Sequence, residues 1–270
     1  MKRDLRRNQS KVRARAKPEK QTELLYGRQP VREMLRAGRR QCFEVVIAGG
    51  ARGSRELDEI RSLAGAAGVD IRPGDPRDFS AAGGGSHHQG VLALVSPYPY
   101  ADLDGIRERL ARTGVPPLVV LLDHVQDPQN LGSIMRTAEA AGADAVIIPS
   151  DRAACVTPAA VRASSGAAEH IRVARVTNLV RTMKALQKDG LWLSGLEDVS
   201  DAKPFTEADL SGPVGLVIGA EGAGLGRLVR ETCDFLVSLP MYGNVSSLNA
   251  GVAAGIILYE CVRQRVSADG

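Results

Sequence analysis

The stretch that decides the fold reads LVVLLDHVQDPQNLGSIMR, residues 118–136. It opens with five apolar residues, Leu118 to Leu122, an unbroken run that is typical of a strand covered on both faces. A polar turn from Asp127 to Ser133 follows and leads into a segment with helical spacing. A strand that feeds a helix in this way indicates a parallel α/β sheet, in which ligands bind where the strands end.

The same succession recurs along the C-terminal half of the chain. Apolar runs predict further strands at residues 145–148, 191–193, 214–218 and 235–239. Helical patterns lie between them at about 131–141, 157–165, 178–188 and 224–231, and a last helix runs from about 247 to 263. The alternation predicts one parallel sheet with its helices packed on the faces.

Two more polar turns follow strands of this series. Ile218 to Gly224 comes after one strand, and Leu239-Pro240-Met241 leads from another into the stretch Asn244 to Asn249. Because the carboxyl ends of parallel strands meet at one edge of a sheet, the three turns predict a single site assembled from distant sequence.

The glycine-rich stretch Glu221 to Gly226 resembles the turn that binds dinucleotides in Rossmann domains. However, no Asp or Glu occurs from Phe235 through Tyr259, so the acidic residue that would hold a ribose is missing. The stretch also lies late in the strand–helix series rather than at its opening. A Rossmann-type oxidoreductase or methyltransferase is therefore disfavoured, and the glycines are expected to let backbone approach a ligand closely.

Helix ends and small residues give three local expectations. Asn130 is placed to cap the helix that begins near Leu131, and Ser246 or Ser247 is placed to cap the last helix. Small residues crowd the first turns of that last helix, from Ala250 to Gly255. Because glycine is costly inside a helix, they predict very close packing, either of a threaded chain or of a helix–helix dimer.

The N-terminal half divides into a leader, a small domain and a linker. Residues 1–23 form the leader, which holds nine Lys and Arg among its first 20 residues against Asp4 and Glu19. Such a segment is expected to be disordered alone and to attract nucleic acid, with a solubilising or targeting tail as the alternative. Residues 24–96 read as a small α/β domain, residues 97–115 as a linker around two prolines, and residues 116–270 as the parallel-sheet domain.

Composition excludes several classes of protein. Aromatic residues make up 4% of the chain, which argues against a stacking surface for single-stranded nucleic acid. No apolar run is long enough to span a membrane, and the N-terminus lacks an apolar signal core, so we expect a cytoplasmic protein without a membrane partner. The four cysteines form no Cys-x-x-Cys pair and have no His at ligand spacing, so neither a disulfide framework nor a metal site is expected.

Together the three turns resemble the motifs of the SpoU-type RNA ribose 2′-O-methyltransferases of the SPOUT superfamily. The resemblance is carried by the spacing of Asn130 and Arg136, by Gly219-x-Glu221-Gly222, and by Leu239-Pro240-Met241 followed by Ser247-Leu248-Asn249. Residues 24–96 are similar to the L30e-like substrate-binding domain of the subgroup that methylates a guanosine in the peptidyl-transferase P-loop of 23S rRNA. Three further stretches support that subgroup: His88-Gln89-Gly90, Ser165 to Glu169, and Arg175 to Leu179.

The resemblance implies a fold, a cofactor, partners and a set of site residues. The fold is α/β, with a C-terminal SPOUT domain tied in a trefoil knot, and the implied cofactor is S-adenosylmethionine. The implied partners are RNA and a second copy of the chain, with no metal and with the site near the dimer interface. The cofactor-binding residues are Gly219, Leu239, Met241 and Leu248. The catalytic residues are Asn130, Arg136, Glu221, Ser247 and Asn249.

Other functions stay open at the level of sequence. The same chemistry could act on a guanosine ribose in tRNA or on another 23S site. A ribosome-associated RNA-binding protein without activity is a third reading, which the presence of all four of Asn130, Arg136, Glu221 and Asn249 argues against.

Overall fold

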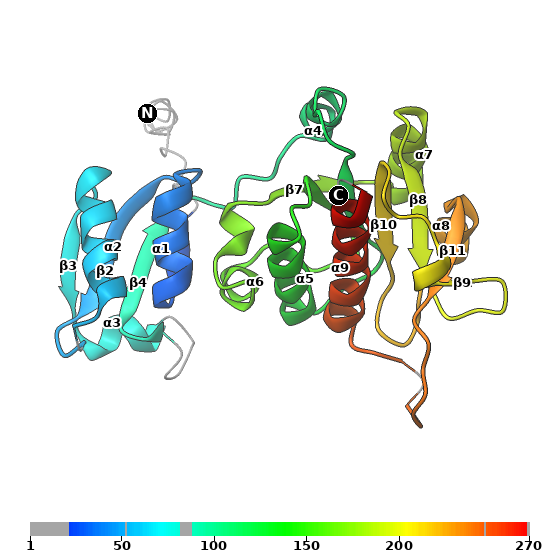
Figure 1. Ribbon diagram of the computed structural model, residues 1–270. Helices are drawn as coiled ribbons and strands as arrows, with labels where there is room; N and C mark the ends of the chain where they lie inside the picture. The colour runs from blue at the N-terminus through cyan, green and yellow to red at the C-terminus, as the bar shows by residue number, and fades with distance from the viewer. Residues whose placement is uncertain (1–21, 52, 82–87, 246, 269–270) are drawn as a thin grey trace, which may run out of the picture.

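The computed structural model describes residues 22–51, 53–81, 88–245 and 247–268 (Figure 1). The basic leader, apart from its last two residues, and Ser246 as a helix cap lie outside these residues. The described chain forms two sheets, one of four strands and one of seven.

The N-terminal part is a small α/β sandwich of one sheet and its helices. Its elements are β1 (Glu23–Tyr26), α1 (Arg28–Ala37), β2 (Cys42–Ala48), α2 (Arg55–Ala66), β3 (Ile71–Gly74), α3 (Pro76–Ala81) and β4 (Val91–Val95). The strand order is β1-β4-β2-β3, in which β4 runs antiparallel to both neighbours and β2 and β3 are parallel. Neither β1 nor α3 was predicted from the sequence, since each is short and carries little hydrophobic periodicity.

The C-terminal part holds the seven-stranded sheet. In chain order its elements are α4 (Leu103–Leu110), β5 (Leu118–Leu122), α5 (Pro128–Ala140), β6 (Ala145–Pro149), α6 (Pro158–Ala163), the 3₁₀ turn η2 (Ala167–Glu169), β7 (Arg172–Val176), α7 (Leu179–Lys188), β8 (Trp192–Leu196), β9 (Lys203–Pro204), the 3₁₀ turn η3 (Phe205–Glu207), β10 (Val214–Ile218), α8 (Arg227–Thr232), β11 (Phe235–Ser238) and α9 (Ala250–Ala268). The order β7-β6-β5-β10-β8-β11-β9 is parallel at every pairing.

Two strands of this sheet were missed by the sequence analysis. In β7, exposed Arg172 and Arg175 flank buried Val173 and Ala174, which interrupts the apolar run that marked the central strands. The strand lies at the sheet edge, where charged side chains are common. At the other edge, β9 is only two residues long.

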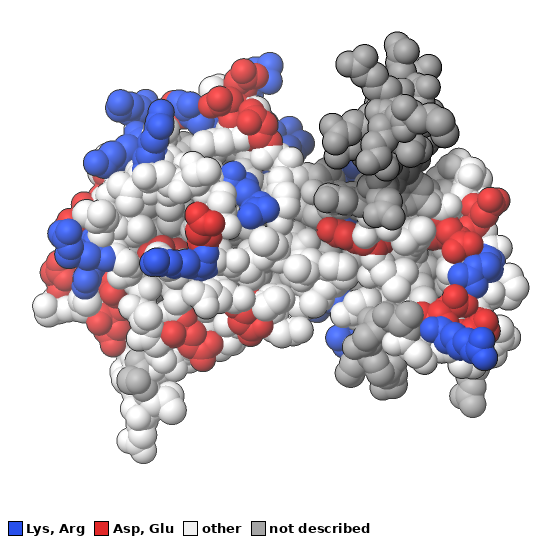
Figure 2. Space-filling view, turned by 180° about the vertical axis from the view of Figure 1, so that it is seen from behind, with Lys and Arg blue, Asp and Glu red and all other residues white. Residues whose placement is uncertain are grey.

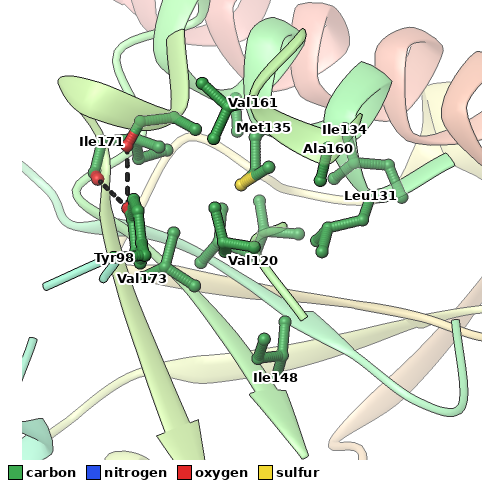
Figure 3. Packing of buried hydrophobic residues seen from close by; sticks show 14 of the residues in the cluster. Tyr98, Val120, Leu131, Ile134, Met135, Ile148, Ala160, Val161, Ile171 and Val173 are labelled. Carbon is green, nitrogen blue, oxygen red and sulfur yellow. Dashed lines mark hydrogen bonds between the residues drawn. The ribbon is translucent and has the colours of Figure 1, made fainter. Parts of the chain in front are cut away.

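Helices cover both faces of the sheet. On one face, Val120 of β5 packs in the same cluster as Leu131, Ile134 and Met135 of α5 (Figure 3). On the other face, Val119 and Leu121 of β5 join the apolar residues of α4, α7 and α8. Alternate residues of one strand thus serve two cores, which explains why the run 118–122 is apolar throughout.

The small residues of α9 pack within the chain. A side chain placed on Gly251 would lie 2.8 Å from Ser133 Oγ of α5, and one on Gly132 of α5 would lie 2.4 Å from Ala163 Cβ of α6. Both glycines therefore allow helix backbones to approach more closely than any side chain permits. Close packing of the last helix is confirmed, with α5 as its partner.

The two expected helix caps were wrong. Helix α5 begins at Pro128, and the Asp127 side chain caps it by accepting a hydrogen bond of 2.9 Å from Gln129 N. Helix α9 begins at Ala250, and Asn249 Oδ1 accepts from Gly251 N at 3.0 Å, so Ser247 is not the cap. Several adjacent residues in each turn have capping side chains, and the sequence alone did not say which of them precedes the first helical residue.

A buried ion pair joins the two parts. Arg40 is fully buried, and its guanidinium lies 3.1 Å from Glu169 Oε1 and 4.8 Å from the centre of the Tyr98 ring. The Tyr98 hydroxyl donates to the carbonyl of Ala168 at 2.7 Å and also lies 3.4 Å from the carbonyl of Ile171, the labelled partner in Figure 3. Burial raises the pKa of Glu169, an effect that exceeds the opposing pull of Arg40 and Arg39.

We expect Glu169→Gln to destabilise the protein by about 2 kcal/mol, because it removes the charge of one partner of buried Arg40, which keeps only the partly exposed Glu23 carboxylate. Urea denaturation monitored by circular dichroism measures the change. The matched control is Asp58→Asn, which breaks the exposed pair of Asp58 with Arg61 and should cost less than about 1 kcal/mol. Equal, small effects of both variants would contradict a structural role for the buried pair.

Candidate active site

The carboxyl ends of β8, β10 and β11 open onto a cavity of about 290 Å³. Figure 1 shows the segments that follow these strands at the same end of the sheet. All four residues expected to bind the cofactor line the cavity, together with Glu221 and Ser247 of the expected catalytic set. Those four are Gly219, Leu239, Met241 and Leu248. The structure thus brings the second and third polar turns into one site.

The loop from Gly219 to Gly226 forms one wall of the cavity. It folds back on itself so tightly that a side chain on Gly219 would lie 2.3 Å from the Gly224 carbonyl oxygen. Gly222 and Gly224 have φ angles of 76° and 65°, in the left-handed region that favours glycine. The loop therefore offers bare backbone to whatever occupies the cavity.

Asp123 holds this loop in place. It directly follows β5, is 1% exposed, and its Oδ2 accepts a hydrogen bond of 2.7 Å from Gly226 N. Its other oxygen lies 2.5 Å from His124 Nδ1. Asp123 was not among the site residues predicted from the sequence, although an acidic residue at the end of a fully apolar strand was an available signal.

Three side chains form a hydrogen-bonded triad. Asn249 Nδ2 donates to Asn130 Oδ1 at 2.7 Å and to Glu221 Oε2 at 3.3 Å, while Asn130 Nδ2 donates to the same Glu221 oxygen at 3.4 Å. The three residues come from the first turn of α5, the glycine loop and the residue before α9. Each of the three polar turns therefore contributes one member.

Arg136 stands apart from the triad. It lies nearly two turns further along α5, its side chain is exposed, and its Nη1 donates to Ser165 Oγ at 3.1 Å. Among the described residues it makes no hydrogen bond to Asn130, Glu221 or Asn249. Of the five expected catalytic residues, the fold thus unites three, places Ser247 in the cavity lining and directs Arg136 towards the end of α6.

The cavity is acidic. Glu197, Asp198 and Glu221 line it, and no Lys or Arg is among its described lining residues. Glu197 Oε2 is buried and accepts no hydrogen bond from the described chain, and Arg230 Nε lies 3.6 Å away. The lining therefore suits a ligand that carries positive charge and hydrogen-bond donors. Glu197 and Asp198 were not predicted as site residues, although they follow β8 just as the other site residues follow their strands.

Cys233 lies between α8 and β11, outside the lining of the cavity. Burial, with the nearby carboxylates of Asp234, Glu197 and Asp123, raises the pKa of Cys233 to about 12, so this thiol stays protonated at neutral pH. Over the residues that the structure describes, no group of three His, Cys, Asp or Glu side chains is placed to hold a metal ion. Nor does the described chain contain a helix long and apolar enough to cross a membrane.

Comparison with known families now identifies the class of protein. Residues 117–259 match the model of the SpoU rRNA Methylase family, and residues 24–101 match that of the RNA 2′-O ribose methyltransferase substrate-binding domain. The chain belongs to the SpoU family of RNA methyltransferases. The enzyme class expected from the sequence is confirmed, and so is S-adenosylmethionine as the cofactor.

Relatives and solved structures agree with this assignment. The 23S rRNA (guanosine-2′-O-)-methyltransferase RlmB of Pseudomonas putida is 43% identical over 91% of this chain and 98% of its own length. The putative TrmH family tRNA/rRNA methyltransferase YacO of Bacillus subtilis is 51% identical over 66% of this chain and 71% of its own. The SpoU methyltransferase AviRb of Streptomyces viridochromogenes, solved with AdoMet, superposes with a TM-score of 0.75 at 32% identity and 91% coverage of both chains. The expected fold class is confirmed.

We expect Gly219→Ala to weaken the binding of S-adenosylhomocysteine about tenfold or more, because the new methyl group collides with the Gly224 backbone and overpacking of this kind costs 1–3 kcal/mol. Isothermal titration calorimetry measures the affinity. Gly243→Ala is the matched control, since a side chain there meets nothing within 4 Å. Unchanged affinity in a folded Gly219→Ala variant would show that the loop does not form the cofactor seat.

Proposed function

We propose that this enzyme transfers a methyl group from S-adenosylmethionine to the ribose 2′-oxygen of a guanosine in 23S rRNA, and that it works as a homodimer. The observation that carries the proposal is the triad of Asn130, Glu221 and Asn249 beside an acidic, glycine-walled cavity. The RlmB relatives, which are named for this reaction, extend over nine tenths of the chain and support the choice of substrate.

The cavity lining fits the cofactor. When bound, S-adenosylmethionine supplies a methyl group on a positively charged sulfur, and the carboxylates of Glu197, Asp198 and Glu221 match that charge. We assign cofactor binding to the backbone of Gly219, Leu239 and Leu248, with Met241 beside them; these are the bare or apolar parts of the lining.

The triad is assigned to orienting the ribose. Glu221 accepts from both amides, which fixes the rotation of Asn130 and Asn249 before any substrate arrives. Preorganised hydrogen-bonding groups of this kind lower the cost of reaching the reactive geometry. Ser247 is exposed in the same lining, and its hydroxyl is assigned a further hydrogen bond to the ribose.

Arg136 is assigned to the charge that develops on the 2′-oxygen. A guanidinium stays protonated in proteins, so it cannot remove the hydroxyl proton as a general base. It can stabilise the forming alkoxide and hold the neighbouring phosphate in a bidentate grip. This role explains why Arg136 keeps an exposed head that no carboxylate neutralises within the described chain.

The surface away from the cavity suits an RNA partner. In the rear view of Figure 2, Lys and Arg gather over the end of the molecule that carries α4 and α7. Exposed Arg109, Arg112, Arg181, Lys184 and Lys188 contribute there, and none of them forms an ion pair in the described chain. We assign contact with the phosphate backbone to this surface, RNA binding to the domain at 24–96, and non-specific phosphate attraction to the leader at 1–23.

A second copy of the chain is assigned to the outer face of α9. Val252, Ile256, Tyr259 and Val266 are 52%, 37%, 52% and 68% exposed. Their spacing places them along one face of the helix, and a stripe of large exposed apolar residues marks an interaction site. Helix α9 starts directly after Asn249, so a partner on this face would border the active site.

We expect the wild-type enzyme to place one methyl group on a 23S guanosine, and Arg136→Ala to lower the rate at least about 100-fold, since it removes the charge that stabilises the alkoxide. The assay follows label from S-adenosylmethionine into unmethylated 23S rRNA or bulk tRNA, and mass spectrometry locates the modified nucleotide. Arg227→Ala is the control, since Arg227 is an exposed arginine on α8 that lies outside the basic surface and pairs with Glu231. Label in tRNA alone would overturn the substrate, and equal activity of Arg136→Ala would overturn its role.

We expect Ile256→Arg to convert the dimer into a monomer, because it buries a charge in the centre of the apolar stripe. Sedimentation equilibrium distinguishes the mass of one chain from that of two. Val115→Arg is the control, since Val115 is an exposed apolar residue that lies outside α9. If the wild-type protein sediments as a single chain, the homodimer is wrong.

A further inference from the structure

The turn that follows α6, residues 164–170, ends a helix in an unusual way. Gly166 N donates to Val161 O at 3.0 Å and Ser165 N donates to Arg162 O at 2.9 Å. This pair of hydrogen bonds is the Schellman motif, in which the residue after the C-cap takes a left-handed conformation and is usually glycine. Here that residue is Ser165, with φ of 54°, and Gly166 follows with φ of 90°.

A serine in this position needs an explanation. A side chain in the left-handed region crowds the neighbouring carbonyl, so glycine would fit the turn at lower cost. Backbone strain of this kind persists where interactions of the surrounding structure hold the residue in place, and such residues cluster at functional sites. The Ser165 hydroxyl has one partner in the described chain, the guanidinium of Arg136, whose Nη1 donates to it at 3.1 Å.

The other side of the turn is held by the N-terminal domain. A side chain on Gly166 would lie 2.6 Å from Glu33 Cβ, so α1 packs directly against this glycine. Further along, His170 Nε2 lies 3.0 Å from Glu33 Oε2, and Glu169 pairs with buried Arg40. Burial opposes ionisation of Glu33, but hydrogen bonds with His170 and Arg32 and the charge of Arg36 bring its pKa below the usual value.

The hydrogen bond with Ser165 restricts the orientation of the Arg136 guanidinium. A long, exposed arginine has many rotamers and loses that freedom when it must grip a ribose or phosphate. The Ser165 hydroxyl anchors one guanidinium nitrogen in advance and leaves the remaining donors for the substrate. Because three contacts with the N-terminal domain fix the turn, the anchor is rigid.

We propose that Ser165 is a positioning residue that orients Arg136 for methyl transfer, and that the N-terminal domain holds Ser165 in place through the 164–170 turn. The inference rests on the proposed function, since Arg136 acts there on the 2′-oxygen. It also gives the stretch Ser165 to Glu169, singled out in the sequence, a physical role: one end faces the catalytic arginine and the other end faces the substrate-binding domain.

The test is Ser165→Gly, which relieves the backbone strain and removes the hydroxyl. Thermal denaturation should show a melting temperature equal to or above that of the wild type. Single-turnover methyl transfer to RNA should slow about tenfold, equivalent to about 1.4 kcal/mol of barrier, with unchanged affinity for S-adenosylhomocysteine. If Ser165 has only a structural role, the melting temperature and the rate of methyl transfer should fall together, or both should stay unchanged.

Two further variants separate the hydroxyl from the backbone. Ser165→Asn keeps an acceptor within reach of Arg136 and tolerates the left-handed conformation, so it should retain most of the rate. Arg152→Gly relieves the same strain at another left-handed residue, φ 53°, and should leave the rate unchanged. In an Arg136→Lys background, Ser165→Gly should have little additional effect, because the anchored group is already gone.

Different outcomes overturn the positioning role of Ser165 and the proposed methyl-transfer function. A wild-type enzyme that methylates no RNA overturns the proposed function itself. A wild type that is active, with Ser165→Gly equally fast, overturns the positioning role and leaves the function standing. A loss of rate in Ser165→Gly that persists at full size in the Arg136→Lys background also overturns it, because the serine would then act through some other group.

Discussion

The close approach of neighbouring segments at a few glycines, where no side chain would fit, is the constraint on which the catalytic domain depends. Gly132 brings α5 against α6, and Gly251 brings α9 against α5. Asn130 lies at the start of α5 and Asn249 immediately before α9, so the distance between these helices sets the 2.7 Å bond between the two amides. Gly219 imposes the same closeness on the loop that carries Glu221. The packing at these glycines therefore determines how accurately Asn130, Glu221 and Asn249 are placed relative to one another.

Charge divides the molecule into two regions of opposite sign. The cavity gathers Glu197, Asp198 and Glu221, while exposed Lys and Arg gather over the end that carries α4 and α7 (Figure 2). Opposite potentials keep a cationic and an anionic ligand from competing for one surface. In the function that we propose, Arg136 brings positive charge to the substrate oxygen close to the cofactor.

The sequence predicted what depends on local pattern and missed what depends on tertiary partners. The apolar run 118–122, the glycine loop and the last helix were all found, because each has a strong periodic or compositional signal. The caps of α5 and α9 were misplaced, since neighbouring Asp127 and Asn130, or Ser247 and Asn249, have equal capping chemistry. The anchoring of Arg136 by Ser165 joins residues 29 positions apart, and no pattern within either segment indicates it.

Asn249 performs two tasks with one side chain: its oxygen caps α9 and its nitrogen completes the triad. Docking of the final helix and assembly of the active site are consequently a single event. A chain in which α9 has not packed against α5 therefore lacks the hydrogen bonds from Asn249 to Asn130 and Glu221. The order of the triad thus reports, within the fold itself, whether the last helix has docked.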